Sequence, residues 1–398
     1  MPAPSRLRSA SRAVPFALLW FAAACQTNDP YALTMTEQEI ATAGSSLTCD
    51  SPLAQVHCHA RAIVGANGCP RGNPAPAGFG PTQLRSAYKI TGSGSSATTI
   101  AVVEAYGYPT AEADLAVYRT QFGMSACTTA NGCFRKVNQY GTTSPIPDFN
   151  MSWAVETAVD LDMASAICRN CKLLVVEANS ASFDDITAAV ETAVALGAHV
   201  VNNSYGGDEL AGSEYEYRYN YPSVAFVASS GDVGFGQGVQ FPSSSDYVTA
   251  VGGTTLTAAS NSRGWTETAW IGSTSGCSFV FDKPSWQHDT GCEGRTVADV
   301  AAVADPNTGV AVYGPTSDTA SAWIVIGGTS VAAPIVAGVY GVNGGAVHTS
   351  SDPYSHLSGL FDVKSGLTGF CEPEYLCNSG VGYDGPTGLG TPNGITAF

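Results

Sequence analysis

The segment "IGGTSVAAPIVAG" (residues 326–338) places a serine, Ser330, on a glycine turn ahead of a stretch rich in alanine and valine. Proline is tolerated in the first turn of a helix but not deeper inside it, so Pro334 requires a helix to begin close to Ser330. The hydroxyl then lies at a helix N-terminus, where backbone N–H groups can face a developing oxyanion. The segment indicates either a nucleophilic serine or an ordinary helix-capping serine.

The string "GTSVAAPIVAG" resembles the nucleophile segment of the subtilisin-like superfamily, in which the base is a histidine on a helix soon after the first strand. None of the six histidines lies between residues 60 and 198, where that helix must be: they are His57, His59, His199, His288, His348 and His356. A histidine base is therefore excluded by position.

The same interval holds "VETAVDLD", in which Glu156 and Asp160 are four residues apart. On a helix this spacing projects both carboxylates from one face. A coupled carboxyl pair has one raised apparent pKa, which makes it a usable general base at acidic pH. The alternative is a solvated acidic helix face, which an E-x-x-x-D pair alone usually marks.

Composition limits the classes of partner and compartment. The net charge of −16 over 398 residues argues against nucleic acid and anionic lipid as partners. Twelve cysteines indicate an oxidising compartment. Arg6, Arg8 and Arg12 precede the apolar run "AVPFALLWFAAAC", which is typical of a secretory signal over residues 1–24. No stretch is long enough to span a bilayer comfortably.

Cys25 at the end of "FAAAC" resembles a bacterial lipobox, whose cysteine is acylated after cleavage. The alternative is an ordinary signal cut near the alanines, with Cys25 free or in a disulfide. The sequence favours the lipobox, because a cysteine is otherwise unusual at this position. The sequence suggests membrane attachment only through a lipid anchor at Cys25. Acylation of Cys25 would leave eleven cysteines, an odd number, for disulfides.

Short spacings among the cysteines predict local disulfides. Cys127 with Cys133, Cys277 with Cys292, and Cys371 with Cys377 each close a short loop. Cys168 and Cys171 in "CRNC" could also form a redox pair or half a zinc site, but a second ligand pair and the expected strand context are missing. A local disulfide at a helix end is the preferred interpretation. Cys49, Cys58 and Cys69 are expected to tie down the N-terminal region.

The chain divides into three regions. Residues 25–80 are rich in Pro, Gly, Ser and Ala without sustained periodicity, and we interpret them as a short N-terminal extension after the signal. Over residues 81–398, strand and helix patterns alternate. Strands are predicted in "TTIAVVEA", "KLLVVEA", "HVVNNS", "VAFVAS" and "DYVTAVGG". Helices are predicted in "TAEADLAVYRTQFG", with Thr110 as N-cap and Gly123 as stop, "MSWAVETAVDLDMASAI" and "FDDITAAVETAVALGA".

Apolar strands that alternate with helices predict a parallel sheet covered on both faces. Ligands in such sheets bind beyond the carboxyl ends of the strands, so residues directly after strands are the first candidates for a site.

Several segments occur together in the order typical of one family. They are "ETAVDLD", "SSGDVGF", "FPSSSDYVTAVGGTTL", "FDKPSWQ", "ADVAAVADPNTG", "GGTSVAAP" and "GYDGPTGLGTP". From about residue 80 to the C-terminus the chain resembles the sedolisin, or serine-carboxyl peptidase, family. The resemblance implies a subtilisin-like three-layer α/β/α sandwich with a mainly parallel sheet. It also implies Glu156 as general base, Asp160 as its carboxylate partner and Ser330 as nucleophile.

The resemblance assigns Asp232 of "SSGDVG" to the oxyanion hole, whereas from the local sequence it could be an aspartate in a turn after a strand. A carboxylate cannot donate a hydrogen bond to an oxyanion, so Asp232 must be protonated in the working enzyme, which favours acidic pH. Glu104 lies where the family often extends the carboxyl network, and a capped strand-end acid is the alternative. Tyr205 stands where many relatives carry tryptophan.

Near the C-terminus, "LFDVKSG" and "SGVGYDGPTG" match the family's D-[IV] and G-x-G-x-D calcium pattern. Ca²⁺ takes six or more oxygen ligands. The resemblance implies carboxylates from Asp362 and Asp384 and carbonyls from Val363, Gly380 and Gly382, holding one structural Ca²⁺. The alternative is a pair of glycine- and aspartate-rich surface turns.

Two features depart from the family. Relatives typically carry a long folded propeptide, and the span before residue 80 is too short for one, so the protein matures differently or the extension itself inhibits. "TSVAAP" also replaces the commoner "TSASTP"-like form, so substrate-pocket details do not transfer. The sequence thus predicts a secreted or envelope-attached, monomeric, acid-active endopeptidase for protein or peptide substrates. The alternatives are a non-catalytic, disulfide-stapled binding module of the envelope and an exopeptidase of the same family.

Overall fold

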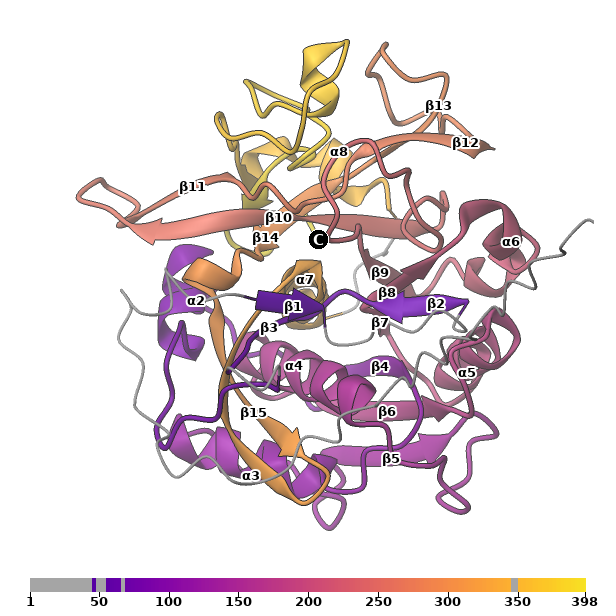
Figure 1. Cartoon of the computed structure of the whole chain (residues 1–398), viewed down its shortest axis with the longest axis vertical. Helices are drawn as coiled ribbons and strands as arrows, with labels where there is room; N and C mark the ends of the chain where they lie inside the picture. Colours follow the sequence, from indigo (N-terminus) through magenta and orange to yellow (C-terminus); the bar gives the residue numbers. More distant parts are fainter. Residues whose placement is uncertain (1–44, 48–54, 66–68, 345–349) are drawn as a thin grey trace, which may run out of the picture.

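The computed structural model describes residues 45–47, 55–65, 69–344 and 350–398 (Figure 1). A large sheet with strand order β11-β10-β9-β7-β4-β6-β5 forms its centre, and β14 also pairs with β10. All these pairs are parallel except β10–β11. The strands are β4 (Thr99–Ala105), β5 (Phe134–Asn138), β6 (Lys172–Ala178), β7 (Val200–Asn203), β9 (Ala225–Ser229), β10 (Val248–Ala258), β11 (Trp265–Ala269) and β14 (Val300–Val303).

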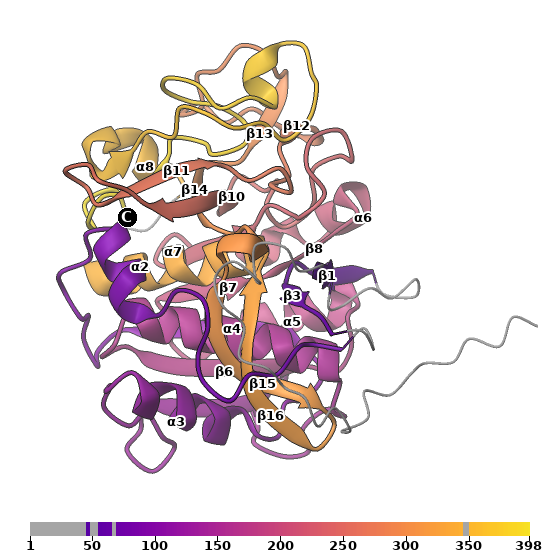
Figure 2. The same ribbon diagram turned by 60° about the vertical axis from the view of Figure 1, so that its left-hand side comes forward.

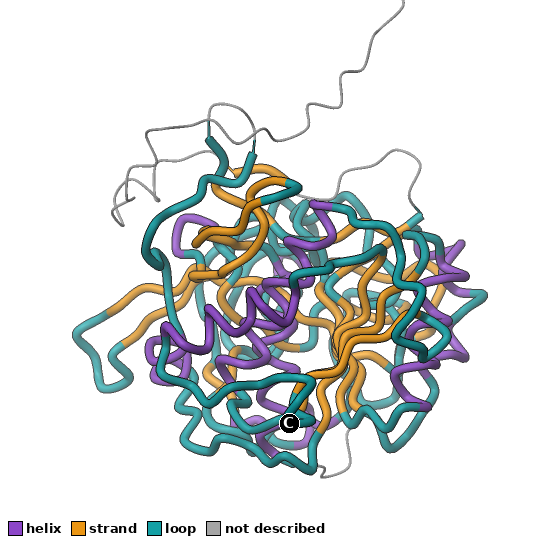
Figure 3. Tube along the Cα trace, turned by 90° about the horizontal axis from the view of Figure 1, so that it is seen from below, coloured by secondary structure: helices purple, strands orange, loops and turns teal. Residues whose placement is uncertain are grey.

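Helices cover both faces of this sheet (Figure 3). Along β4, Ile100 and Val102 pack in a core with α4 (Met151–Ile167) and α7 (Thr329–Asn343), while Ala101 and Val103 pack in a second core with α5 (Phe183–Ala195). Successive strand residues point to opposite faces, so both faces must be apolar, and this explains the continuous hydrophobic runs. The predicted α/β/α sandwich is confirmed.

Local capping explains where the central helices begin. Asn150 accepts a hydrogen bond from the backbone N–H of Trp153 and starts α4, and Ser182 does the same for α5 through Asp185. α3 (Ala111–Gln121) follows Thr110 as predicted, but the Thr110 hydroxyl donates to the Asp114 carboxylate and makes no capping bond. The helices predicted from "MSWAVETAVDLDMASAI" and "FDDITAAVETAVALGA" are therefore confirmed.

A second sheet, β1-β3-β16-β15, lies beside α4, with β15 (Val310–Ser317) and β16 (Ala320–Gly327) as its long hairpin (Figure 2). β1 (Ser45–Leu47) and β3 (Arg61–Ile63) come from the N-terminal extension. β2 (Val56–Cys58) pairs with β8 (Tyr205–Gly207). The extension, which shows no sustained periodicity in sequence, thus adds strands to the body of the protein.

The remaining elements surround this core. They are the pair β12 (Gly276–Asp282) and β13 (Gly294–Val297), the pair β17 (Leu360–Phe361) and β18 (Thr391–Pro392), helices α2 (Pro81–Ala87), α6 (Glu209–Ser213) and α8 (Asp352–Ser355), and the 3₁₀ turns η1 (Glu216–Tyr219), η2 (Pro306–Thr308), η3 (Leu357–Gly359) and η4 (Glu374–Leu376). Among the described residues, no helix has the length and apolar character needed to cross a membrane.

Disulfides close the predicted local loops. The pairs are Cys127–Cys133, Cys168–Cys171, Cys277–Cys292 and Cys371–Cys377. Cys168 and Cys171 therefore form a local disulfide, as preferred over a zinc half-site. Cys58 and Cys69 are also disulfide-bonded. Cys25, Cys49 and the proposed signal over residues 1–24 lie outside the described residues.

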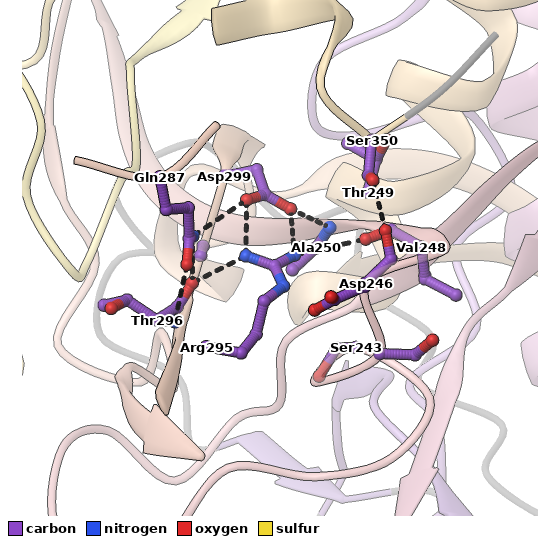
Figure 4. A network of polar contacts seen from close by, with 12 residues as sticks. Ser243, Asp246, Val248, Thr249, Ala250, Gln287, Arg295, Thr296, Asp299 and Ser350 are labelled. Atoms are coloured by element: carbon purple, nitrogen blue, oxygen red, sulfur yellow. Dashed lines mark hydrogen bonds and ion pairs between the residues drawn. The ribbon is translucent and has the colours of Figure 1, made fainter. Parts of the chain in front are cut away.

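A buried ion pair ties the turn between β13 and β14 to β10 (Figure 4). The Arg295 guanidinium donates to both carboxylate oxygens of Asp299, at 2.7 and 2.5 Å, and neither residue is exposed. Asp299 also accepts the backbone N–H of Ala250 at 2.7 Å, and Arg295 donates to the carbonyl of Val248. Removal of one partner would leave a buried charge without compensation, which is far costlier than loss of an exposed pair.

We therefore expect Asp299→Ala to lower the free energy of unfolding by about 3–5 kcal/mol, measured by urea denaturation. Glu191→Ala is the matched control, because Glu191 pairs with Arg218 at 3.5 Å but is 40% exposed. That substitution should cost about 0–1 kcal/mol. Equal small losses in both variants would show that the buried pair contributes no more than a surface pair.

Candidate active site

Ser330 is the second residue of α7 and is fully buried. Gly328 precedes the helix with φ of 96°, a conformation that favours glycine. The Ser330 hydroxyl donates to the carbonyl of Ser204 at 3.2 Å. Pro334 lies inside α7, one turn further from the helix start than the sequence predicted, yet the helix continues because its residues from Thr329 to Val342 are buried against the sheet and α4.

A cluster of three buried carboxyl groups lies next to Ser330. Glu156 and Asp160 project from α4, Glu104 comes from β4, and all three are 0% exposed. The solvated-face alternative for Glu156 and Asp160 is therefore wrong. No N–H or O–H of the described residues donates to either oxygen of Glu104, whose carboxyl group hydrogen-bonds that of Asp160. Two carboxyl groups can hydrogen-bond each other only when one of them carries a proton.

Burial governs the acidity of this cluster. It raises the pKa of Glu156 well above its ordinary value, reinforced by the charge of Asp160 and opposed by the nearby Ser330 and by the hydrogen bond from the Ala60 N–H. It raises the pKa of Asp160 to about 7, opposed by hydrogen bonds from Glu104, Ser204 and Asn202. The Asp160 oxygens accept from Asn202 Nδ2 at 2.6 Å and Ser204 Oγ at 2.7 Å. The cluster therefore retains protons at acidic pH.

Asp232 follows β9 and reaches the N-terminus of α7. Its Oδ1 accepts the backbone N–H of Thr329 at 2.8 Å and the Thr329 hydroxyl at 2.9 Å. Its Oδ2 pairs with Arg61 Nε at 3.2 Å. Burial raises the pKa of Asp232 to about 6, and the Arg61 charge and the Thr329 hydrogen bonds oppose that rise.

The N-terminal extension passes directly over these groups. His59 donates its backbone N–H to Ser330 Oγ at 3.1 Å, and its carbonyl accepts from the Ser330 backbone N–H at 3.5 Å. The next backbone N–H, of Ala60, donates to Glu156 Oε2 at 3.0 Å. The structure thus brings Glu104, Glu156 and Asp160 together with Ser330, Asp232 and a stretch of the chain's own backbone.

The two aspartates predicted to bind Ca²⁺ lie at one glycine-rich loop. Gly382 N–H donates to both oxygens of Asp362 at 3.2 Å, and Gly380 N–H donates to Asp384 at 3.0 Å. Asp384 is buried, and burial raises its pKa to about 7. Nothing lies within 4 Å of a Cβ built on Gly380 or Gly382, so the loop has open space around it. The described residues contain no group of three or more His, Cys, Asp or Glu suited to a metal.

Sequence analysis missed several residues of the site. Asn202 and Ser204 hold Asp160, and both lie directly after or within β7, where the strand-end rule could have found them. An inhibitory role of residues 25–80 was one of two alternatives from the sequence, but neither His59 nor Arg61 was singled out for contact with the site. Tyr205 bonds Asn203 at 2.7 Å and packs near Trp153, and does not bond the carboxyl cluster.

Comparison with known proteins identifies similar sequences and a similar fold. The subtilase family model matches residues 150–346. Kumamolisin from Bacillus sp. (strain MN-32) is 31% identical over 81% of this chain and 63% of that protein. Sedolisin from Pseudomonas sp. (strain 101) is 27% identical over 79% of this chain and 60% of that protein. The chain thus spans about three fifths of the length of these two curated relatives.

A solved structure shows a similar fold. Pseudomonas sedolisin, described as a serine-carboxyl proteinase complexed with two molecules of pseudo-iodotyrostatin, superposes with a TM-score of 0.68 at 26% identity. The match covers 80% of this chain and 96% of that one. The fold, the order of the motifs and these relatives agree: the chain is similar to the sedolisin family of serine-carboxyl peptidases, within the subtilisin-like superfamily.

Proposed function

We propose that this protein is an exported serine-carboxyl endopeptidase that hydrolyses proteins or peptides at acidic pH. The observation that carries the proposal is the buried set of carboxyl groups around Ser330, in which Glu156 lies near enough to the serine for Ser330 to lower its pKa. Both nitrogens of the nearby His59 ring are bonded elsewhere, to Ser229 Oγ and Gln240 Oε1. A carboxylate is therefore the base available to the Ser330 hydroxyl.

In the proposed mechanism, ionised Glu156 takes the proton of Ser330 as the hydroxyl attacks the substrate carbonyl. Glu156 then gives that proton to the leaving amine, and water repeats the sequence on the acyl-enzyme. Asp160 and Glu104 hold a proton beside Glu156, which lets one carboxylate of the cluster stay ionised without several like charges being buried together.

The oxyanion is held by the Ser330 backbone N–H and by protonated Asp232. A pKa of about 6 makes Asp232 a hydrogen-bond donor only in acid. The mechanism thus needs one carboxyl group ionised at Glu156 and another protonated at Asp232, and this combination places the working range on the acidic side.

An endopeptidase is favoured over an exopeptidase because backbone pairing is available on both sides of Ser330. β2 pairs with β8 on one side, and β3 pairs with β16 on the other. A polypeptide can therefore continue in both directions from the serine. A non-catalytic binding module is disfavoured because the proposed catalytic residues are all present and lie around one site. They are Glu156, Asp160, Asp232 and Ser330.

Other parts of the proposal concern maturation and location. Residues 1–24 act as a signal, residues 25–80 form an extension and residues 81–398 form the peptidase domain. The protein works outside the cytoplasm as a monomer, and acylation of Cys25 would hold it at the envelope. Nucleic acid is not a partner, because the net charge of −16 repels phosphates.

One structural Ca²⁺ is proposed at the Gly380–Gly382 loop, held by the carboxylates of Asp362 and Asp384 and the carbonyls of Val363, Gly380 and Gly382. The residues present fit a hard cation, because the carboxylates of Asp362 and Asp384 both contact one glycine-rich loop, with open space around Gly380 and Gly382. Bound Ca²⁺ would stabilise the fold of the C-terminal loops and takes no part in the peptide hydrolysis.

We expect Glu156→Gln to lower kcat/KM on a denatured protein substrate by about 10²–10⁴-fold, since it removes the base, and Ser330→Ala to abolish turnover. In the unmodified enzyme, activity should fall as pH rises through about 6, where Asp232 loses its proton. Glu191→Gln, at an exposed acid, is the control. An alkaline optimum, or full activity in Glu156→Gln, would contradict the carboxyl-base mechanism.

We also expect Ca²⁺ to raise the thermal midpoint relative to a chelator, because an ion that binds only the folded state stabilises it by about 2.7 kcal/mol at 100 times its Kd. Asp362→Asn and Asp384→Asn should each reduce that increment, and Asp318→Asn, at an exposed aspartate away from the loop, should keep it. Calorimetry with and without chelator is the measurement. Identical midpoints in both buffers would count against the site.

A further inference from the structure

A cavity of about 440 Å³ lies at the edge of the central sheet that is opposite to the active site. It is bounded by residues 94–96, which precede β4, and by Arg169 and Asn170, which precede β6. Ser204, which bonds Ser330, instead follows the carboxyl end of β7. Because these strands are parallel, the cavity lies at their amino ends and is separate from the peptidase site. Its volume is within the range of roughly 300–1,000 Å³ that is typical of small-molecule sites.

The polar groups of this cavity are positive or neutral. Two arginines, three serines and one asparagine supply them: Arg119, Arg169, Ser95, Ser96, Ser125 and Asn170. Among the described residues that line the cavity there is no Asp or Glu, although the whole chain has 33 acidic against 17 basic residues. A cavity with fixed positive charge and no negative charge attracts anions. The lining therefore selects the charge of a ligand.

Arg169 has no ion-pair partner within the part of the chain that the structure describes. Its Nε atom is buried and has no acceptor, and no described carboxylate pairs with its guanidinium group. A buried donor without a partner is unfavourable, and more so when it belongs to a charged group. An acceptor that enters the cavity would remove this cost.

Two further arginines, Arg119 on α3 and Arg85 on α2, lie close enough to Arg169 for its charge to act on them. Burial lowers the pKa of Arg119; the charge of Asp162 opposes that change and the charge of Arg169 adds to it. Burial also lowers the pKa of Arg85, and the charge of Arg169 again adds to the change. Asp162 on α4 is itself buried, and burial raises its pKa well above the ordinary value. Three cations thus gather near one buried acid, and a bound anion would reduce their repulsion.

The loop that carries Arg169 is held in place by a disulfide. Cys168 and Cys171 are bonded to each other, and Arg169 lies between them in sequence. Gly94 packs against this disulfide: a Cβ built on Gly94 would lie 2.1 Å from Cys168 Sγ, and its φ is 72°, a conformation that favours glycine. Residues 94–96 therefore approach the disulfide loop closely enough to share the cavity with Arg169.

Arg119 is fixed by hydrogen bonds that do not use all of its donors. Its Nε donates to the carbonyl of Ser125 at 2.7 Å, its Nη1 to Ser165 Oγ at 2.5 Å and its Nη2 to the carbonyl of Arg169 at 2.9 Å. A guanidinium group has five N–H donors, so these three bonds leave two. Arg119 is only 2% exposed, so its position is set before a ligand binds.

We propose that this cavity binds a tetrahedral oxyanion, a phosphate or sulfate group that is free or carried by a small molecule, between Arg119 and Arg169. Guanidinium groups suit such oxyanions because each planar fork donates to two oxygens at once. The hydroxyls of Ser95, Ser96 and Ser125 can donate to the remaining oxygens. The net charge of −16 disfavours a long polyanion, so the ligand is small. The bound group joins α3 to the segment that follows α4 and takes no part in peptide hydrolysis.

The test is calorimetric titration of the purified full-length protein at about pH 7.5 with sodium sulfate and with inorganic phosphate, with sodium chloride added to keep the ionic strength constant. We expect one site per chain, with a Kd of roughly 1 mM or below for both anions. The thermal midpoint should rise with either anion, because a ligand that binds the folded state stabilises it. Chloride at the same ionic strength should give no such rise. Absence of binding by both anions would overturn the proposal.

Arg169→Gln separates a binding role from a structural one. It should weaken sulfate and phosphate binding by about 10–100-fold, since it removes charge-assisted hydrogen bonds. Without these anions its thermal midpoint should not fall below that of the unsubstituted protein, because the substitution removes an unpaired charge beside two other cations. Arg135→Gln, at an exposed arginine of β5 outside the cavity, is the matched control and should bind both anions unchanged. Equal binding in the two variants, or a lower anion-free midpoint in Arg169→Gln, would contradict the assignment.

Further ligands identify the chemical form of the anion. Tighter binding of glucose 6-phosphate than of inorganic phosphate, with no binding of glucose, would assign the cavity to a phosphate monoester, and equal affinities would assign it to the free ion. Acetate should bind at least about tenfold more weakly than sulfate, because a carboxylate offers only two oxygens to two guanidinium groups. Acetate that binds as tightly as sulfate would overturn the choice of a tetrahedral oxyanion. None of these measurements depends on peptidase activity.

Discussion

Burial of three carboxyl groups beneath one serine is the constraint on which the rest of the site depends. Glu104, Glu156 and Asp160 are removed from water by β4, α4 and the strands beside them, and three like charges cannot coexist in such a place. Protons therefore remain in the cluster at pH values where exposed acids are ionised. The amide of Asn202 and the hydroxyl of Ser204, at the end of β7, donate to Asp160 and oppose the rise of its pKa.

The N-terminus of α7 joins this cluster to the opposite side of the site. Gly328 lets the chain turn at positive φ, so that Ser330 N–H, Asp232 and the His59 carbonyl meet at this turn. The extension fits the same place because it offers what any extended peptide offers, which is backbone donors and acceptors on both sides of the nucleophile. Two of its side chains add further contacts: the His59 imidazole bonds Gln240, and the Arg61 guanidinium pairs with Asp232.

Much of the fold could be predicted because its signals are local. α4 begins after Asn150 and covers the predicted segment, since the cap and the helix formers are adjacent in sequence. The disulfides could be predicted because the two cysteines of each pair are close in sequence and have few other partners within reach. Thr110 occupies the N-cap position of α3 as predicted, but its hydroxyl bonds Asp114 and not a backbone N–H. Tertiary packing overrode one expectation: α7 tolerates Pro334 in its second turn because buried packing outweighs one missing hydrogen bond.

Residue types, spacing and order were enough to exclude a histidine base, to single out Glu156, Asp160, Asp232 and Ser330, and to predict parallel strands alternating with helices. The Glu156–Asp160 pair and the strand pattern need only periodicity and the chemistry of side chains, whereas the exclusion of a histidine base and the choice of Asp232 also rest on the resemblance to known families. The contact of residues 56–63 with the active site was decided by tertiary structure alone. Backbone pairing with β8 and β16 depends on extended geometry and not on side-chain identity, so no pattern in the extension could reveal it. The pKa values of the buried acids were likewise set by the surrounding fold, because desolvation depends on every segment that excludes water from them.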